Sequence, residues 1–207
     1  KTIRAMKESL EFRLRQNQIE SLPSCWQFLQ IDTTDDGLEF PAKMLPQNEK
    51  CIVVRPGQTF ESIRESLENR ATNKEERNDL LAGWAIPYSD LDVTKGAGMI
   101  RGIGNQVGIA AADTIYQSLS AAISNLHSGG ATNELATIAQ KMRQSQVKVE
   151  SEPQVMIISS LAGGSGAGMF IDVIEILKRI AEYKAPDGPP TPHPGNCCAL
   201  PQIEQIC

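Results

Sequence analysis

One stretch of the chain decides its fold, and it reads Val155-Met-Ile-Ile-Ser-Ser-Leu-Ala-Gly-Gly-Ser-Gly-Ala-Gly-Met-Phe-Ile-Asp-Val-Ile-Glu-Ile-Leu-Lys-Arg-Ile180. It opens with four apolar residues, 155–158, that do not alternate with polar ones. Such a run is typical of a strand covered on both faces. After the glycines, apolar residues recur at helical spacing, at Phe170, Val173, Ile174, Leu177 and Ile180. The stretch therefore predicts a buried strand, a glycine-rich loop and an amphipathic helix.

The glycine-rich loop predicts a binding site for phosphate. Four of the six residues 163–168 are glycines, which have no Cβ atom to hold a ligand away from the backbone and which permit positive φ. Because a helix follows, its free N–H groups and the positive end of its dipole would point at the same spot. The candidate phosphate-binding residues are Gly163, Gly164, Ser165, Gly166, Ala167 and Gly168.

Several nucleotide-binding folds share such a turn. A P-loop is excluded, because no Gly-Lys-Ser/Thr follows and the loop contains no lysine. The dinucleotide fingerprint of Rossmann enzymes fits poorly, since it belongs to the first βα unit and is followed by an acidic residue about 20 positions later. Here the loop comes late, and a proline-rich tail follows the helix. A glycine-rich turn without a ligand stays open as the plain alternative.

The composition is that of an ordinary soluble protein, with 207 residues, 41 % hydrophobic and 22 % charged. The net charge of −5 argues against a dedicated nucleic-acid binder. No apolar run approaches the roughly 20 residues that span a bilayer, and no signal peptide opens the chain. The five cysteines and two histidines fit no zinc template. We expect a cytoplasmic protein without a membrane-spanning segment.

The first part of the chain alternates predicted helices with short strands. The patterns predict helices over about 1–19, 61–70 and 74–81, and strands at Trp26–Ile31 and Cys51–Arg55. Ser62-Ile-Arg-Glu65 has the spacing of a capping box. The acidic loop Asp32-Thr-Thr-Asp-Asp-Gly37 follows the first strand, at the end of an open α/β sheet where ligands bind. A solvated turn is the alternative for this loop.

A second glycine-rich loop reads Lys95-Gly-Ala-Gly-Met-Ile-Arg-Gly-Ile-Gly104. Amphipathic helices are predicted after it, over 106–125 and 133–146. Taken alone, this loop is as well explained by a hinge as by a binding loop. Arg101 could add a charge-assisted contact to a phosphate oxygen, although an exposed arginine is the commoner case.

These loops resemble those of the tubulin/FtsZ superfamily. Ala162-Gly-Gly-Ser-Gly-Ala-Gly168 is similar to the family's Gly-Gly-Gly-Thr-Gly-Ser-Gly signature, with Ala162 for the first glycine and Ser165 for threonine. Asp32-Thr33-Thr34-Asp35 looks like the element that follows the family's second strand. Gly96-Ala-Gly98 with Gly104 looks like the loop ahead of its third helix. The three occur in family order.

The resemblance implies an α/β fold, Rossmann-like, with a mostly parallel sheet flanked by helices. The nucleotide-binding domain would cover residues 1–183, and residues 184–207 would form a proline-rich linker and a cysteine-containing tail. The family's first strand, its first glycine-rich loop and its C-terminal part are not matched in this chain. On this reading the chain is an incomplete N-terminal domain.

The resemblance also implies a ligand and a function. The signature loop would hold the phosphates of GTP or GDP, and Gly96, Ala97 and Gly98 would lie near the γ-phosphate. Asp32 and Asp35 would lie near Mg²⁺ through water. The implied function is GTP-dependent self-assembly into cytoskeletal filaments. GTPase activity is expected only if the protein is complete, because the family's water-orienting acidic loop is not matched. A Rossmann-type oxidoreductase and a nucleotide-free scaffold module are the alternatives.

Overall fold

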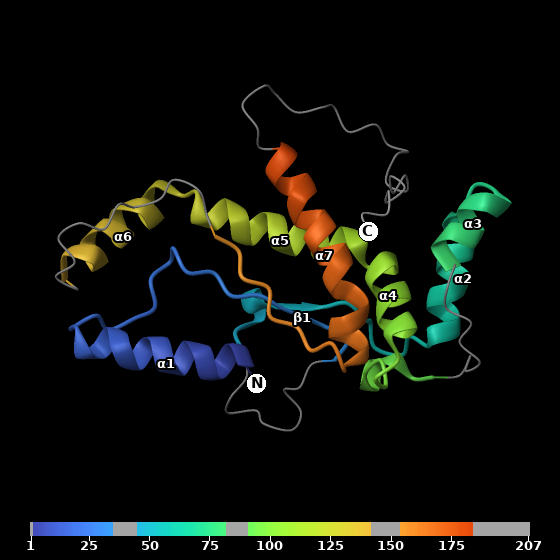
Figure 1. The fold of residues 1–207 in the computed structure, drawn as a ribbon, viewed down its shortest axis with the longest axis horizontal. Coiled ribbons are helices and arrows are strands. Elements are labelled where there is room, and N and C mark those ends of the chain that lie inside the picture. Colours follow the sequence, from blue (N-terminus) through green and yellow to red (C-terminus); the bar gives the residue numbers. More distant parts are fainter. Residues whose placement is uncertain (1, 35–44, 82–90, 142–153, 184–207) are drawn as a thin grey trace, which may run out of the picture.

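The computed structural model describes residues 2–34, 45–81, 91–141 and 154–183 (Figure 1). Helices dominate these residues. In chain order the elements are α1 (Thr2–Gln16), β1 (Gln30–Asp32), the 3₁₀ turn η3 (Gln47–Glu49), β2 (Lys50–Ile52), α2 (Phe60–Arg70), α3 (Lys74–Leu81), the 3₁₀ turn η4 (Val93–Lys95), α4 (Arg101–Ala110), α5 (Ala112–Leu126), α6 (Gly129–Lys141) and α7 (Gly164–Tyr183).

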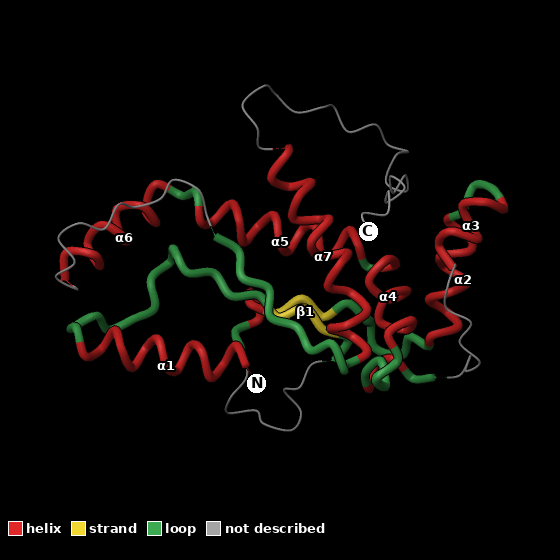
Figure 2. The backbone as a smooth tube through the Cα atoms, viewed as in Figure 1, coloured by secondary structure: helices red, strands yellow, loops and turns green. Residues whose placement is uncertain are grey.

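A small sheet lies at the centre of the molecule (Figures 1 and 2). Helices α1 and α6 lie at one end, α2 and α3 at the other, and α4, α5 and α7 between them. Strands β1 and β2 pair in parallel, with Ile31 opposite Cys51. A parallel pair needs a crossover connection and helices on its faces. The α/β class expected from the sequence is thus confirmed, whereas the described residues contain two strands and not the wider sheet that was expected.

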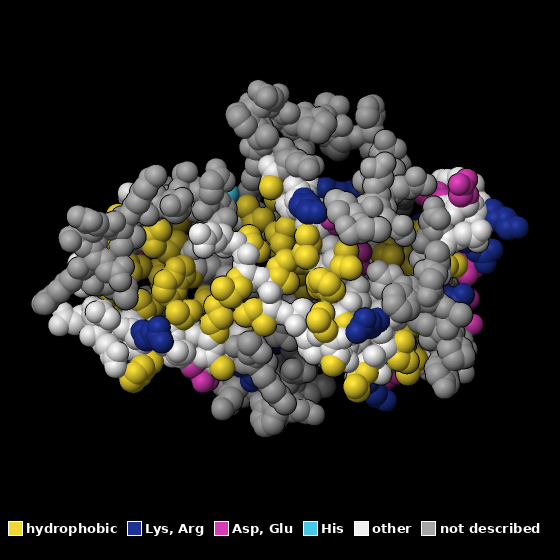
Figure 3. All heavy atoms as spheres, in the orientation of Figure 1, with side chains coloured by type: hydrophobic (Ala, Val, Ile, Leu, Met, Phe, Trp, Pro, Cys, Tyr) yellow, Lys and Arg dark blue, Asp and Glu magenta, His cyan; other side chains and the backbone are white. Residues whose placement is uncertain are grey.

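The segment predicted as a buried strand, 155–158, is extended but belongs to no sheet. Its four side chains are 41–77 % exposed, and Figure 3 shows hydrophobic side chains gathered across the middle of this face of the molecule. Its backbone makes no backbone hydrogen bond to another segment in the part of the chain that the structure describes. A strand exists only through a partner that satisfies its N–H and C=O groups. The prediction of a buried strand is therefore wrong.

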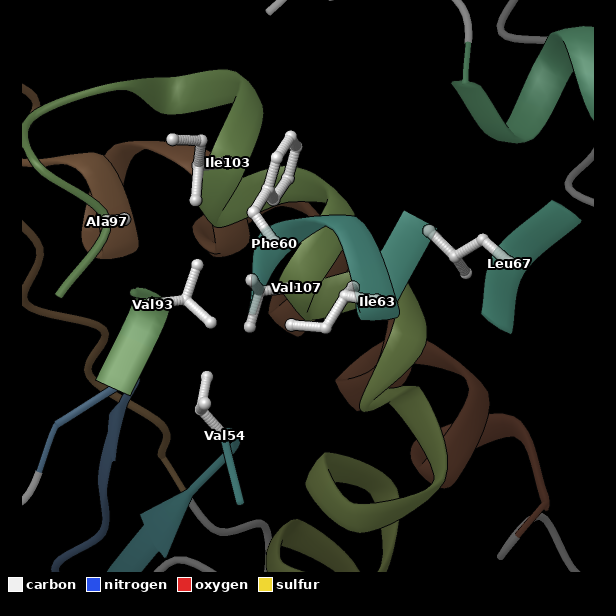
Figure 4. Close-up of a cluster of buried hydrophobic side chains, with 8 residues drawn as sticks. All are labelled: Val54, Phe60, Ile63, Leu67, Val93, Ala97, Ile103 and Val107. Carbon is white, nitrogen blue, oxygen red and sulfur yellow. The ribbon is translucent and has the colours of Figure 1, made fainter. Parts of the chain in front are cut away.

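One hydrophobic core joins α2 to α4 (Figure 4). Apolar residues of both helices meet there with residues that precede each helix, namely Val54, Phe60, Ile63, Leu67, Val93, Ala97, Ile103 and Val107. Phe60, Leu67 and Ile103 are fully buried, and each stabilises the fold by about 1.5–3 kcal/mol. This core anchors the segment that contains Ala97.

A second core joins α7 and α5 to the sheet. It contains Cys51 of β2, Ile115 and Leu119 of α5, and Val173 and Ile180 of α7. The buried positions of α7 lie on the face that its periodicity predicts, so the amphipathic helix is confirmed. A third, smaller cluster of Leu14, Ile19 and Ile138 packs the N-terminal segment against α6.

Several predicted helices are present with different ends. The prediction for 74–81 agrees with α3. The single helix predicted over 106–125 is two helices, α4 and α5, which meet at Ala111. The capping box of α2 is formed by Thr59 and Ser62, each side chain accepting from the other's backbone N–H at 3.2 Å, and not by the Ser62–Glu65 pair.

Two further expectations concern the C-terminal tail and the presence of membrane-spanning helices. The proline-rich linker and tail predicted for 184–207 lie outside the described residues. Within the described ranges, each helix falls short of the length or the apolar character that a bilayer crossing demands.

Candidate functional site

Three loops meet at the N-terminus of α7, and a hydrogen bond joins two of them. Thr33 follows β1, Ser165 lies in the first turn of α7, and their hydroxyl oxygens are 3.0 Å apart. Thr33 is 1 % exposed and Ser165 is half-buried, so the Thr33 side of this contact is shielded from solvent. The loop after β1 is thereby tied to the glycine-rich turn, although 132 positions separate the two residues in sequence.

The third loop is the segment that precedes α4, and it touches both of the others. A Cβ atom on Gly164 would lie 2.7 Å from the Cβ and the carbonyl oxygen of Ala97. A Cβ atom on Gly96 would lie 3.8 Å from Cγ2 of Thr34. The sequence predicts that these three loops lie near the phosphates of a ligand. In the structure the three loops lie next to one another.

Glycines also bring α4 and α7 together, backbone against backbone. A Cβ on Gly104 would lie 2.1 Å from the Gly164 carbonyl oxygen, and one on Gly168 would lie 2.5 Å from the Arg101 carbonyl oxygen and the Asn105 nitrogen. Contacts this short are not found in folded proteins, so no other residue fits at either position without a shift of the helices. The sequence predicts a phosphate cradle at the glycines of 163–168. That role stays a prediction, and this packing role was missed.

The N-terminus of α7 has free hydrogen-bond donors. Helix α7 begins at Gly164, and the backbone N–H of Ala167 donates to the Gly163 carbonyl at 3.2 Å. Within the described residues, the N–H groups of Gly164, Ser165 and Gly166 make no backbone hydrogen bond. Such orphan donors at the positive end of a helix dipole form a site for an anion.

The segment before α4 has an unusual backbone. Gly96, Gly98 and Met99 have positive φ values of +113°, +57° and +64°. At Met99 this conformation costs about 1–2 kcal/mol relative to glycine, and the side chain is 75 % exposed. A Cβ on Gly98 would have no atom within 4 Å. Gly98 thus borders open space next to Ala97 and the terminus of α7.

Two charged candidates from the sequence have partners in the protein. The Arg101 guanidinium donates to the Leu161 carbonyl at 3.1 Å, which ties α4 to the segment before α7. The Asp32 carboxylate accepts from the Thr33 N–H at 2.7 Å and so caps its own loop. Asp35 lies outside the described residues. The described part of the chain contains no group of three His, Cys, Asp or Glu side chains that could hold a metal ion, and Mg²⁺ near Asp32 stays a prediction.

A partly buried polar pair between α4 and α7 was not predicted from the sequence. The Asn105 side-chain amide donates to Oδ2 of Asp172 at 3.3 Å. Burial raises the pKa of the Asp172 carboxyl to about 6, and the hydrogen bond from Asn105 opposes this rise. A signal was present in the sequence, because Asp172 and Glu175 are the only polar residues between Met169 and Leu177.

The parallel strand pair and the helices around it define the class of the chain as α/β, and the loop after β1 meets a glycine-rich helix N-terminus whose free N–H groups suit an anion. A family model described as "Tubulin like" matches residues 1–189, and the chain belongs to this tubulin-like family. The chain matches no curated protein and no solved structure. The resemblance noted in the sequence is thus confirmed at the level of the family.

Proposed function

We propose that this protein binds GTP or GDP where the three loops meet. The observation that carries the proposal is the meeting of Thr33, Ala97 and Ser165 at a helix terminus with free N–H groups. Membership of the tubulin-like family supports guanine as the base. The residues themselves favour a polyphosphate and carry no preference between guanine and adenine.

The phosphate groups would be bound mainly by backbone. The free N–H groups of Gly164, Ser165 and Gly166 would donate to phosphate oxygens, with the Ser165 hydroxyl as an additional donor, and Gly163, Ala167 and Gly168 would complete the cradle. Gly96, Ala97 and Gly98 would border the terminal phosphate, where the open space at Gly98 leaves room. Arg101, held by the Leu161 carbonyl, would add positive charge at the edge of the site.

Magnesium would supply charge neutralisation of the phosphates when bound. The Asp32 carboxylate is the described group that suits it, because hard cations prefer oxygen ligands and Asp32 stands directly before Thr33 at the site. Asp35 would also lie near the ion. Both would act through water molecules.

We further propose that the protein assembles with itself into filaments in the cytoplasm, and that this assembly depends on the bound nucleotide. Residues 1–183 would form the nucleotide-binding domain, and 184–207 a linker and tail. The free thiols of Cys25 and Cys51 suit a reducing compartment. Sedimentation of the protein with GTP, compared with GDP, tests assembly.

Thermal unfolding with Mg²⁺ and GTP, GDP, ATP or NAD tests binding. A ligand at 100 times its Kd adds about 2.7 kcal/mol to the free energy of unfolding. A rise in Tm with GTP and GDP alone supports the proposal. A rise with NAD alone would favour a Rossmann-type oxidoreductase, and a Tm indifferent to all four would favour a nucleotide-free scaffold.

A further inference from the structure

The extended segment 155–158 presents apolar side chains and unpaired backbone at the surface. All four side chains are exposed, and successive side chains of an extended segment point to opposite faces, so neither face is covered. The segment belongs to no sheet, and its N–H and C=O groups bond to no other backbone group in the described ranges. An extended edge of this kind is a template for pairing with a strand of another chain.

The C-terminal end of the 155–158 segment is held in place by α4 and α7. The Arg101 guanidinium donates to the Leu161 carbonyl at 3.1 Å. A Cβ on Gly166 would lie 2.6 Å from Oγ of Ser159, so the end of the segment touches the backbone of α7. Because this end is already ordered, an incoming strand has less chain to order when it binds.

The stretch that contains the segment carries no charge. Asp, Glu, Lys and Arg are all absent from residues 153–171, although the whole chain has a net charge of −5. Charged residues and proline are the devices that keep natural edge strands from pairing with another chain, and residues 154–171 contain neither. Two copies of the chain can therefore meet through this stretch without like-charge repulsion. A charged peptide would find no opposite charge there, which favours a second copy as the partner.

The apolar run also suits pairing with itself. In an antiparallel pair centred between Met156 and Ile157, Val155 lies opposite Ile158 of the second copy, and Met156 lies opposite Ile157. Each segment then satisfies the backbone groups of the other. Because the run does not alternate with polar residues, apolar side chains meet across the pair on both faces. The same residues face each other from both sides, so the contact closes as a two-fold dimer.

We propose that two copies of this chain form a two-fold dimer in which their 155–158 segments pair as antiparallel strands. The apolar side chains that Figure 3 shows across the middle of this face surround the contact. The pairing uses no nucleotide and ends at two copies. It is thus distinct from the nucleotide-dependent filament assembly proposed above.

Sedimentation of the nucleotide-free chain over a range of protein concentrations tests the dimer. A reductant prevents the five cysteines from cross-linking two copies. The mass should rise with concentration from 22.6 kDa toward twice that value and no further. Hydrogen exchange measured on the same samples should show that the amides of 155–158 become protected as the dimer forms.

Met156→Lys places lysine side chains close to each other across the two-fold axis, and we expect the Kd of the dimer to rise about tenfold or more. Met156 is 77 % exposed, so the variant should keep the Tm of the monomer. Met156→Ile keeps an apolar side chain and should dimerise as the wild type does. Phe12→Lys is the matched control, because Phe12 is an exposed apolar residue of α1, outside the proposed contact.

Three results would overturn the inference. The wild type could stay at the mass of one copy at every concentration, or its mass could grow beyond two copies. Met156→Lys could also dimerise as tightly as the wild type. A failure of the protein to bind GTP would bear on the proposed function alone, since these samples contain no nucleotide.

Discussion

The hydroxyl groups of Thr33 and Ser165 form a hydrogen bond of 3.0 Å that joins the end of the sheet to the start of α7. Thr33 has almost no contact with solvent, so water cannot replace a lost partner. The bond therefore stabilises the arrangement of the loops as well as the fold.

Removing this bond should destabilise the protein. Ser165→Ala leaves the buried Thr33 hydroxyl with only its longer hydrogen bond of 3.5 Å to the Asp32 carboxylate, and we expect a loss of about 1–2 kcal/mol in the free energy of unfolding, measured with urea. Thr33→Val should cost a similar amount, and the double variant should cost less than the sum. Ser66→Ala, an exposed change on α2, should stay within about 0.5 kcal/mol of wild type. Additive losses would show that the two hydroxyls do not interact.

The glycine contact between α4 and α7 should not tolerate a methyl group. Gly→Ala within a helix normally gains up to about 1 kcal/mol. At Gly104 the added Cβ would meet the Gly164 carbonyl oxygen at 2.1 Å, and we expect a loss of about 3 kcal/mol or more, as for strong overpacking. Gly130→Ala is the matched control, because Gly130 lies in α6 with open space around it. A Gly104→Ala protein as stable as the wild type would disprove the contact.

Gly163 and Gly164 allow ligand binding to be separated from packing. A Cβ on Gly163 would have its nearest neighbours at 3.9 Å, so Gly163→Ala should fold with a stability within about 0.5 kcal/mol of wild type. If phosphate approaches the backbone there, GDP affinity should fall by about tenfold, or 1.4 kcal/mol. Unchanged affinity would place the phosphates elsewhere. Gly164→Ala is uninformative about ligand binding, because it pushes Ala97 away even without nucleotide.

The Asp172 carboxyl should make the stability of the ligand-free protein depend on pH. Its pKa is about 6 in the folded protein against an ordinary value of 3.8, so the folded state binds more protons between these values. The free energy of unfolding should therefore fall as the pH rises from about 4 to about 6 and stay lower above that. Asp172→Asn should remove this fall and stabilise the protein at pH 7.5 by about 1–2 kcal/mol, after allowance for partial solvent screening. Equal pH dependence in the two proteins would exclude the carboxyl as its source.

Periodic patterns predicted the helices well. The spacing of Val173, Leu177 and Ile180 depends only on local geometry, so the buried face of α7 could be predicted. The run at 155–158 could not be assigned in the same way. An apolar extended segment becomes a strand only when another strand pairs with it, and sequence pattern says nothing about the presence of that partner.

The glycines show a second limit of sequence reasoning. The absence of a Cβ at Gly164 or Gly168 leaves room, but the sequence does not say what fills it. In the structure the α4 segment fills it at both positions. Asp172 was missed for a related reason, since an acidic residue in an amphipathic helix suits a solvated position and the sequence does not show that Asn105 of α4 packs against it.

The backbone contact at Gly104 and Gly168 couples any movement of α4 directly to α7. Side chains between two helices absorb small movements by changing rotamer, and where Gly104 and Gly168 bring the two backbones into contact no side chain lies between them. A displacement of the loop around Ala97 must therefore pass to α7 as a whole. The 20 residues of this helix span about 30 Å, and Ile180 near its far end packs in the same cluster as Cys51 of the sheet. A ligand that displaced the loop around Ala97 would therefore also shift the end of α7 that packs beside the sheet.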